Sequence, residues 1–587
     1  MKNNIKTNWN FKLFYKNDND PQIEQDFNDF EKEAISFEKK YRNNFGYTTN
    51  PSRLLQACKD YEKLNTTPRF AKPYFYFHLR KDVDSDNKIL SAKINLFQER
   101  LNKISNKTLF FVLALGKIDP KNQKMFLKDK SLSKYHYFLK KVFEESRYSL
   151  SEAEEKMINL LSTPSTSMWT EGVDKVLSKQ EIKFKNELIP VSKASGILSN
   201  LKTGDRRSLN SLINKKLMEV SDFSEAEINA VYTTKKISDE LRGFKTPYQA
   251  TVKSYENDEA VVENLVKVVT DNFKVAHRFY KIKAKLLKEK RLNYADRSAS
   301  IGTINKNFSF EETVKILSNT YKKIDEKYLE IFTSYLKNGQ IDVYPKKGKR
   351  GGAYCWGGYG LPTFVLLNHA DNYNSVLTIG HEMGHAIHTE MSHTQPAVYA
   401  DYTISVAETA STLFENFVFE EIYEKLSDKE KIVALHNRIN DSIATIFRQI
   451  ACFNFEKELH ETIRKDGYCA KEDIVKIMNK HMKNYLGPLF DLTDEDGYFF
   501  VSWMHIRTFF YVYSYAYGCL ISNALYYEYK KDKNFKDKIE QFLKAGGSKS
   551  PEDIFGDIGI NIRDPKFFEN GIKAIEEDIK KLEKLVK

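Results

Sequence analysis

The chain has 587 residues, and its 25 glycines and 14 prolines make about 7% of the total, compared with about 12% in average proteins. So few helix-breaking residues exclude collagen-like, linker-rich and all-β designs, and 41% hydrophobic residues exclude disorder over most of the length. The net charge of +12 contains no block of five like charges, so we interpret it as a solvated Lys/Glu surface and expect no nucleic-acid partner.

The N-terminal segment and the cysteines indicate the compartment. The first residues, MKNNIKTNWNF, lack the apolar stretch of a secretory signal, and no run of 18 apolar residues predicts a membrane span. The five cysteines are odd in number and show neither metal-ligand nor CxxC spacing, which favours a reducing environment. They are Cys58, Cys355, Cys452, Cys469 and Cys519. We therefore expect a cytoplasmic protein without a membrane partner, either a monomer or a homo-oligomer.

Three segments carry apolar residues at alternating spacings of four and three, which predicts amphipathic helices. These segments are Ile23–Tyr41, Leu90–Ile104 and Phe568–Val586. Stripes of this kind are typical of the seams between packed helices. We expect the first two segments to pack together as an antiparallel hairpin.

Two loop signals predict a boundary near residue 195. The first is STPST at 162–166, and the second combines SKASG and LKTGDRR between 192 and 207. We therefore divide the chain into an N-terminal helical domain, 1–195, and a second domain, 196–587.

The composition changes between Lys346 and Asn374, where six glycines are followed by a β-rich run, Thr363–Leu367, that ends the Gly-rich stretch. Glycines permit positive φ angles and let another backbone approach closely. The segment predicts a short strand beside a Gly-rich turn in a chain that is otherwise helical. An isolated β-structure of this kind suggests a functional role.

The motif HEMGH at residues 381–385 follows directly, in an apolar helical context. On a helix, His381 and His385 are four residues apart, so both imidazoles project from one face and can bind one metal ion. Glu382 lies beside them, where it can take a proton from a water molecule on the metal. The motif therefore predicts a hydrolytic metal site.

A catalytic zinc needs a third protein ligand and one open position. A metzincin would have Gly at 388 and His at 391, but this chain has His388 and Met391, which excludes that class. Glu408 lies 23 residues beyond His385 in a helical segment and is the candidate third ligand. Glu415, two turns further on, is placed to orient a ligating histidine. We interpret His388 as a packing residue.

Downstream, His505 precedes an alternating run of tyrosines. They are Tyr511, Tyr513, Tyr515 and Tyr517. The run fits a strand or a helix ringed with tyrosines, and buried aromatics are its ordinary interpretation. A zinc hydrolase nevertheless needs a donor for the oxyanion that forms at the attacked carbonyl, and a Tyr hydroxyl or a His N–H can supply one.

Together these segments resemble oligoendopeptidase F, within the thimet oligopeptidase group of zinc peptidases. The likeness rests on HEMGHAIH, DYTISVAETAST, PTFVLLN and His505 followed by FYVYSYAYG. It extends more weakly to YKIKAKLLKEKRLNYADRSASI. The resemblance implies a mostly α fold of two helical halves around a deep substrate channel, with a thermolysin-like HExxH helix and a small β-sheet near the active site.

The resemblance also assigns roles to residues. It implies that His381, His385 and Glu408 bind one zinc ion per chain, and that Glu382 is the general base. It implies an oxyanion site formed by His505 with one or both of Tyr511 and Tyr513. Finally, it implies that the Gly-rich stretch Gly351–Tyr354 and the strand after it hold the substrate backbone by β-addition, with Gly352, Ala353 and Tyr354 as the substrate-binding residues.

The resulting hypothesis is a zinc-dependent oligoendopeptidase that cleaves internal bonds of short unfolded peptides. A metallocarboxypeptidase on a similar helical HExxH scaffold is the closest alternative, and it would release single C-terminal residues. A non-catalytic helical scaffold that binds peptide or RNA is a third hypothesis. It predicts no stoichiometric zinc and leaves HEMGH and Glu408 unexplained.

Overall fold

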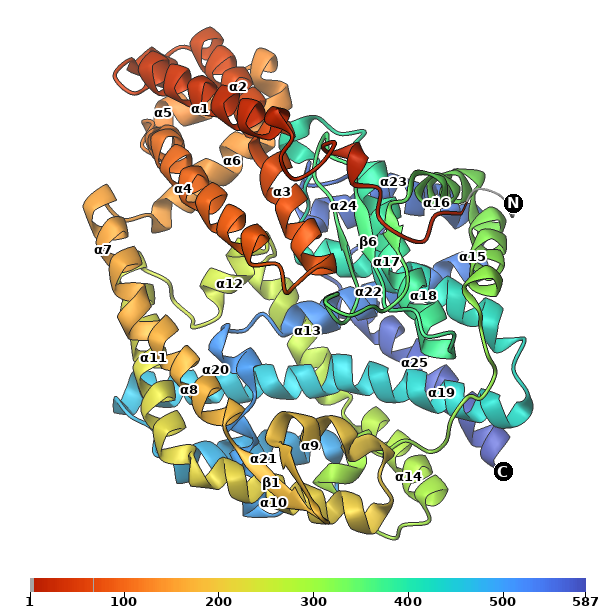
Figure 1. Ribbon diagram of the computed structural model, residues 1–587. Helices are drawn as coiled ribbons and strands as arrows, with labels where there is room; N and C mark the ends of the chain where they lie inside the picture. The colour runs from red at the N-terminus through yellow and green to blue at the C-terminus, as the bar shows by residue number, and fades with distance from the viewer. Residues whose placement is uncertain (1–4, 67) are drawn as a thin grey trace.

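The computed structural model describes residues 5–66 and 68–587 of a mostly helical protein with three very small sheets (Figure 1). The prediction of a mostly α fold with a small β-sheet is confirmed. Among the described residues, none of the helices combines the length and the apolar character that a bilayer crossing requires.

The N-terminal helices form one hydrophobic cluster, drawn in red and orange in Figure 1. They are α1 (Pro21–Tyr41), α2 (Pro51–Thr66), α3 (Pro68–Val83), α4 (Lys88–Gly116), α5 (Pro120–Phe126) and α6 (His136–Glu145). The apolar stripes of α1 and α4 do pack together, with the rings of Phe27 and Phe97 5.2 Å apart. The antiparallel arrangement is wrong, however. Arg100 bonds Glu24, and Lys107 pairs with Glu38 further along both helices, so the two run in the same direction with α2 and α3 between them in sequence.

A helical connection leads to the second part of the chain. It comprises α7 (Glu152–Ser162), α8 (Met168–Ser178), the hairpin strands β1 (Glu181–Phe184) and β2 (Glu187–Pro190), and α9 (Val191–Ile197). The loop predicted at 162–166 is wrong, because a π-helical turn, Thr163–Ser167, joins α7 to α8. Pro164 lies in this turn, where the π-helical backbone departs from the regular i→i−4 hydrogen-bond ladder and accommodates the missing N–H.

A larger hydrophobic cluster begins at the hairpin and contains most of the remaining helices. They are α10 (Thr203–Glu219), α11 (Ser221–Arg242), α12 (Gln249–Ser254), α13 (Glu259–Asp271), α14 (Lys274–Leu287), α15 (Phe310–Ile324), α16 (Glu326–Asn338), α19 (Asp428–Ser442), α20 (Arg448–Asp466), α21 (Lys471–Leu486), α23 (Lys536–Lys544), α24 (Pro551–Asp557) and α25 (Pro565–Val586). Helices α19 and α20 continue into one another through a π-helical turn, Ile443–Phe447 (Figure 1). The apolar stripe predicted at the C-terminus is buried on α25.

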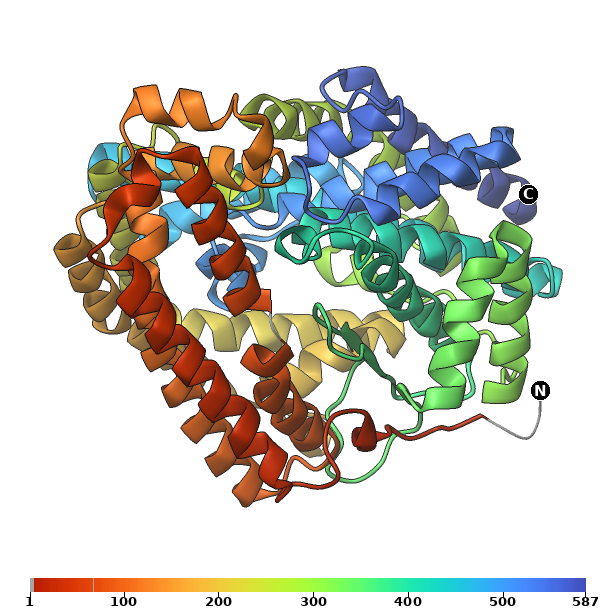
Figure 2. The same ribbon diagram turned by 90° about the horizontal axis from the view of Figure 1, so that it is seen from above.

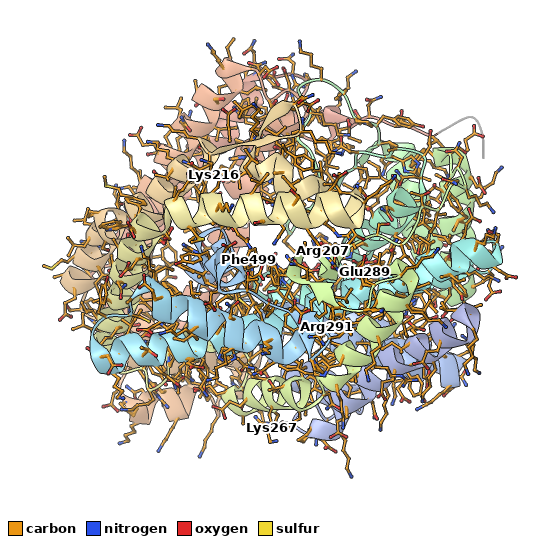
Figure 3. All side chains as sticks on the ribbon, turned by 90° about the horizontal axis from the view of Figure 1, so that it is seen from below. Arg207, Lys216, Lys267, Glu289, Arg291 and Phe499 are labelled. Carbon is orange, nitrogen blue, oxygen red and sulfur yellow. The ribbon has the colours of Figure 1, made fainter. Side chains whose placement is uncertain are left out.

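One polar cluster holds α10 to the segment after α14. Asp296 is fully buried, and its two carboxylate oxygens accept hydrogen bonds from Arg206 and Arg207. Arg207 also lies 3.3 Å from Glu289, and Figure 3 shows both side chains near Arg291 on this face. A buried carboxylate is tolerated here because both of its oxygens are paired with arginines.

Three helices carry the site and pack closely on one another. They are α17 (Tyr373–Ser392), α18 (Ile404–Tyr423) and α22 (Tyr513–Lys531). A Cβ at Gly384 would lie 2.7 Å from the Cα of Ser411, so the glycine inside HEMGH lets α18 approach α17. A Cβ at Gly518 would lie 3.0 Å from the Cβ of Glu408, so a second glycine lets α22 approach α18.

A three-stranded sheet lies beside α17. Its strands are β4 (Ile341–Asp342), β5 (Tyr354–Trp356) and β6 (Phe364–Leu366), in the order β4-β6-β5, so the predicted short strand is present. The remaining strands β3 (Leu292–Asn293) and β7 (Phe490–Asp491) pair with each other. The N-terminal segment runs along the sheet (Figure 2), where the indole N–H of Trp9 donates to Val365 O at 2.9 Å. This contact ties the two hydrophobic clusters together.

Candidate metal centre and substrate site

Helix α17 presents both motif histidines on one face. Its start is set by Asn372, whose side chain accepts a hydrogen bond from the N–H of Ser375 at 3.0 Å. One turn separates His381 from His385, and their ring centroids are 5.0 Å apart. The local helix therefore brings the two imidazoles together without help from the rest of the fold.

Glu408 of α18 completes a three-ligand group. Its carboxylate oxygens lie 3.6 Å from Nε2 of His381 and 3.9 Å from Nε2 of His385. One ligand atom from each of the three residues lies within 4.8 Å of the others. Tetrahedral zinc, with bonds of about 2.0–2.2 Å, places its ligand atoms about 3.4 Å apart, so two imidazoles and a carboxylate at these distances fit the ion.

Two further contacts orient these ligands. Oε2 of Glu415 lies 3.0 Å from Nδ1 of His381, which is the contact that the sequence predicted. The hydroxyl of Ser411 donates to Oε2 of Glu408 at 3.3 Å. Partners of this kind hold a ligand in the rotamer and tautomer that binding needs.

The electrostatics of the site reflect burial among carboxylates. Burial by itself lowers the pKa of His381, but the hydrogen bond and charge of Glu415, with Glu382 and Glu408 nearby, raise it to about 9. Burial and the neighbouring His381 lower the pKa of His385 to about 3. The carboxylates around His381 favour its positively charged form, and the same carboxylates would favour a divalent cation.

Glu382 lies next to the ligands and is 7% exposed. Burial raises its pKa to about 7, with His381 acting in the opposite direction. The backbone N–H of Cys355 on β5 bonds its carboxylate. The candidate base is thus held between the metal-site helix and the edge strand of the sheet, and its proton affinity suits exchange near neutral pH.

His505 and Tyr511 are brought together, and their side chains form a hydrogen bond. The sequence analysis gave Tyr515 no role of its own, yet its ring lies 6.0 Å from His505 and 5.6 Å from Tyr511, which were both proposed for the oxyanion site. Tyr515 also lines a cavity of about 320 Å³ together with His381 and Glu408. The four-residue spacing of Tyr511 and Tyr515 is the signal that could have found it, once the run is taken as helical.

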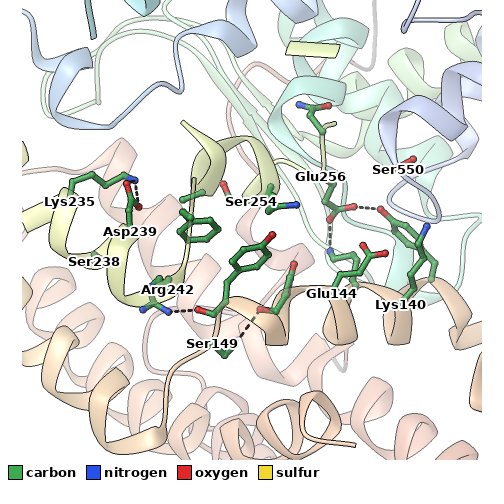
Figure 4. Close-up of a pocket in the computed structure, with 18 residues that line it drawn as sticks. Lys140, Glu144, Ser149, Lys235, Ser238, Asp239, Arg242, Ser254, Glu256 and Ser550 are labelled. Atoms are coloured by element: carbon green, nitrogen blue, oxygen red, sulfur yellow. Dashed lines mark hydrogen bonds and ion pairs between the residues drawn. The ribbon is translucent and has the colours of Figure 1, made fainter. Parts of the chain in front are cut away.

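Tyr513 lies on another side of the same helix. It is fully buried, and its hydroxyl accepts a hydrogen bond from the side chain of Asn257 at 2.9 Å. Asn257 lines a different cavity, of about 480 Å³, between α6 and the helices α11 and α12 (Figure 4). The ion-paired Lys141 and Glu256 are among its lining residues, and none of the predicted site residues is among the described residues that line it.

The predicted substrate-binding stretch leads into β5, which begins at Tyr354 and lies at one edge of its sheet. β5 pairs with β6 on one side, and the order β4-β6-β5 leaves its other side without a strand among the described residues. The hydroxyl of Tyr354 donates to Asp82 of α3 at 2.6 Å, and Gly352 has a φ of +79°. The Tyr354 side chain is therefore tied to the N-terminal helices, and what Ala353 and Tyr354 can offer a substrate is backbone.

His388 packs in the protein interior, as the sequence predicted. It is fully buried, and its ring stacks on Tyr402 at 3.7 Å. Burial lowers its pKa to about 3.

Comparisons with known proteins identify the family. A family model described as "Peptidase family M3" matches residues 210–574, and one described as "Oligopeptidase F" matches residues 115–179. An oligoendopeptidase F homolog of Borreliella burgdorferi is 27% identical, over 95% of this chain and 94% of its own. The oligopeptidase PepF of Bacillus subtilis is 25% identical, over 94% of this chain and 84% of its own.

Solved structures show the same fold. A putative peptidase from Chlamydophila abortus superposes with a TM-score of 0.86 at 21% identity, over 99% of this chain and 98% of that one. Oligoendopeptidase-F from Enterococcus faecium superposes with a TM-score of 0.70 at 18% identity, over 96% of this chain and 99% of that one.

Proposed function

The chain belongs to peptidase family M3 and is a metalloendopeptidase, and from this premise we propose that it is a zinc-dependent oligoendopeptidase that cleaves internal bonds of short unfolded peptides. The observation that carries the proposal is the convergence of His381, His385 and Glu408 within 4.8 Å, directly beside Glu382. The similar oligopeptidases cover nearly the whole chain, which supports a short-peptide substrate.

In this proposal His381, His385 and Glu408 hold one zinc ion per chain. When bound, zinc supplies a Lewis acid that makes water nucleophilic near neutral pH and polarises the scissile carbonyl. Glu382 takes the proton from the attacking water and delivers it to the leaving amine. Its position between α17 and β5 places it beside the expected path of the peptide, and its burial favours a carboxyl that both accepts and releases a proton.

His505 and Tyr511 are proposed as donors to the oxyanion, because their side chains are already bonded to each other on the side of Tyr515, which shares a cavity with two metal ligands. We propose the same role for Tyr515 in place of Tyr513, because Tyr515 lines the cavity that His381 and Glu408 share, whereas Tyr513 is fully buried beside Asn257. In the tautomer in which Nδ1–H of His505 donates to the Tyr511 hydroxyl, the hydroxyl proton stays free for the oxyanion.

The free edge of β5 is proposed to hold the substrate backbone, with Gly352, Ala353 and Tyr354 adding it as a further strand. Backbone pairing favours an extended peptide and is largely independent of side chains. This arrangement suits unfolded peptides of varied sequence. The five unpaired cysteines support a cytoplasmic location.

Digestion of a mixed peptide pool, about 5–40 residues long, tests the proposal when the metal content is quantified and both ends of every product are mapped by mass spectrometry. Internal cleavage confined to short peptides, and lost after chelation and in Glu382→Gln, is the expected result. Release of single C-terminal residues would instead identify a metallocarboxypeptidase. A zinc-loaded protein that cuts no peptide would refute the substrate class.

A further inference from the structure

The segment that carries His505 and Tyr511 contains an unusual turn. Phe509 and Phe510 both adopt left-handed backbone conformations, with φ of +48° and +61°. Bulky residues rarely occupy this region, and two in succession persist only where the surrounding structure holds them. The turn immediately precedes Tyr511, whose hydroxyl bonds His505. It therefore sets the direction in which Tyr511 leaves the backbone.

Glu456 of α20 bonds this turn from inside the protein. Its carboxyl is fully buried, and Oε1 accepts the backbone N–H of Phe510 at 3.0 Å. Oε2 has no hydrogen-bond partner in the part of the chain that the structure describes. Burying a carboxyl that makes a single hydrogen bond in the protein interior lowers the stability of the folded state. The contact with Phe510 is the one structural use that the described residues make of it.

Three more side chains hold the same segment from two other helices. The hydroxyl of Thr251 donates to Phe509 O at 2.8 Å, and the hydroxyl of Tyr232 donates to Ile506 O at 3.0 Å. Arg507 forms a buried two-bond pair with Glu227, at 3.0 and 2.8 Å. Glu456 differs from these because it bonds the residue directly before Tyr511.

We propose that Glu456 is a positioning residue of the reaction: by accepting the Phe510 N–H it holds the left-handed turn that places the Tyr511 hydroxyl on His505. The inference rests on the proposed function. Loss of the acceptor leaves a buried N–H unpaired and releases the turn, while the metal ligands on α17 and α18 are untouched. Loss of the Glu456 carboxyl is therefore expected to lower kcat and to leave the metal content unchanged.

Glu456→Leu and Glu456→Gln separate the hydrogen-bond acceptor of Glu456 from the space that its side chain fills. Leu fills the space without an acceptor, whereas Gln keeps an oxygen at the same reach. We expect Glu456→Leu to lower kcat at least about tenfold with KM and zinc content within about twofold, and Glu456→Gln to stay within about threefold of the wild type. Leu54→Ala, in the fully buried core of the N-terminal cluster, controls for loss of stability. Equal kcat in Glu456→Leu and the wild type would overturn the proposal.

A double-mutant cycle tests whether Glu456 acts through Tyr511. In a Tyr511→Phe background, Glu456→Leu is expected to lower kcat by less than about twofold further, because the group that it positions is already absent. Losses that multiply would show that Glu456 acts elsewhere and would overturn the inference.

Hydrogen exchange of the backbone amides between Ile506 and Tyr513 provides a readout without catalysis. Exchange is expected to be at least about tenfold faster in Glu456→Leu than in the wild type, Glu456→Gln and Leu54→Ala. Unchanged exchange in Glu456→Leu would refute the proposal that Glu456 holds the turn, even if activity fell. If the wild type cleaves no peptide but the variants show this exchange pattern, the proposed function is refuted and the role of Glu456 in holding the turn is supported.

Discussion

Oε2 of Glu415 lies 3.0 Å from Nδ1 of His381, and Nε2 of the same ring faces Glu408 at 3.6 Å. The two carboxylates lie two turns apart on α18 and face opposite nitrogens of one imidazole. This arrangement leaves Nε2 of His381 as the nitrogen available to a metal ion. It makes Glu415 part of the metal site without being a ligand.

Replacing Glu415 therefore weakens metal binding. We expect Glu415→Ala to raise the dissociation constant for zinc about 10–100-fold, because His381 loses the partner that fixes its ring and tautomer. Competition with a chelator of known affinity measures the change. Glu424→Ala, an exposed position at the end of the same helix, is the matched control. Zinc affinity equal to that of the control would contradict the role of Glu415.

Glu382→Gln separates metal binding from catalysis. The amide cannot take a proton, so we expect kcat to fall at least about 10³-fold while zinc content stays at one per chain. Steady-state kinetics and metal analysis on the same preparation provide the check. Substantial remaining turnover would mean that another group is the base.

Tyrosine variants distinguish the two predicted donors. We expect Tyr511→Phe to lower kcat about 10²–10³-fold, because one oxyanion donor is lost. Tyr513→Phe is expected to keep kcat within about twofold and to lower the free energy of unfolding by about 1–3 kcal/mol, because the buried amide of Asn257 loses its partner. Kinetics and urea unfolding of both variants test the assignment, and the reverse pattern would restore Tyr513 as the donor.

Glu456 predicts a pH dependence of stability. Burial raises its pKa from 4.5 to about 8, so between these values the native state binds a proton that the unfolded state has released. The free energy of unfolding therefore falls as pH rises through this window, by at most about 1.4 kcal/mol per pH unit, and the effect levels off above pH 8.

Glu456→Gln removes this titration. Its stability relative to the wild type is expected to increase from about pH 5 to about pH 8 and then to remain constant. Urea unfolding at a series of pH values measures the difference, with Glu461→Gln, an exposed position on the same helix, as the control. Parallel curves for Glu456→Gln and the wild type would contradict the buried, neutral carboxyl.

Local spacing was a reliable guide where the feature is local. His381 and His385 share a face because they are four residues apart on a helix, and no distant contact is needed to bring them together. Glu408 and Glu415 could be proposed because their helix follows closely in the chain and they share one of its faces, and the family resemblance implied the ligand role of Glu408. The apolar stripe of α25 was predicted for the same reason.

Non-local arrangements were predicted less well. α1 and α4 pack as expected, but their direction is parallel because α2 and α3 intervene. The Tyr run alternates with a period of two, and that pattern does not show where a helix begins. α22 begins at Tyr513, so Tyr511 remains in the preceding turn, next to His505, while Tyr513 faces Asn257.

The sequence by itself determined the helical character of the chain, the pair of histidines and the identity of the candidate base, because each depends on residues within one or two helical turns. Only the tertiary structure decided which tyrosines lie beside His505, and that Glu456 holds the turn before Tyr511. Those contacts join α20, α22 and the segment between α21 and α22 through packing. Packing depends on the approach of elements far apart in the chain, which no local spacing encodes.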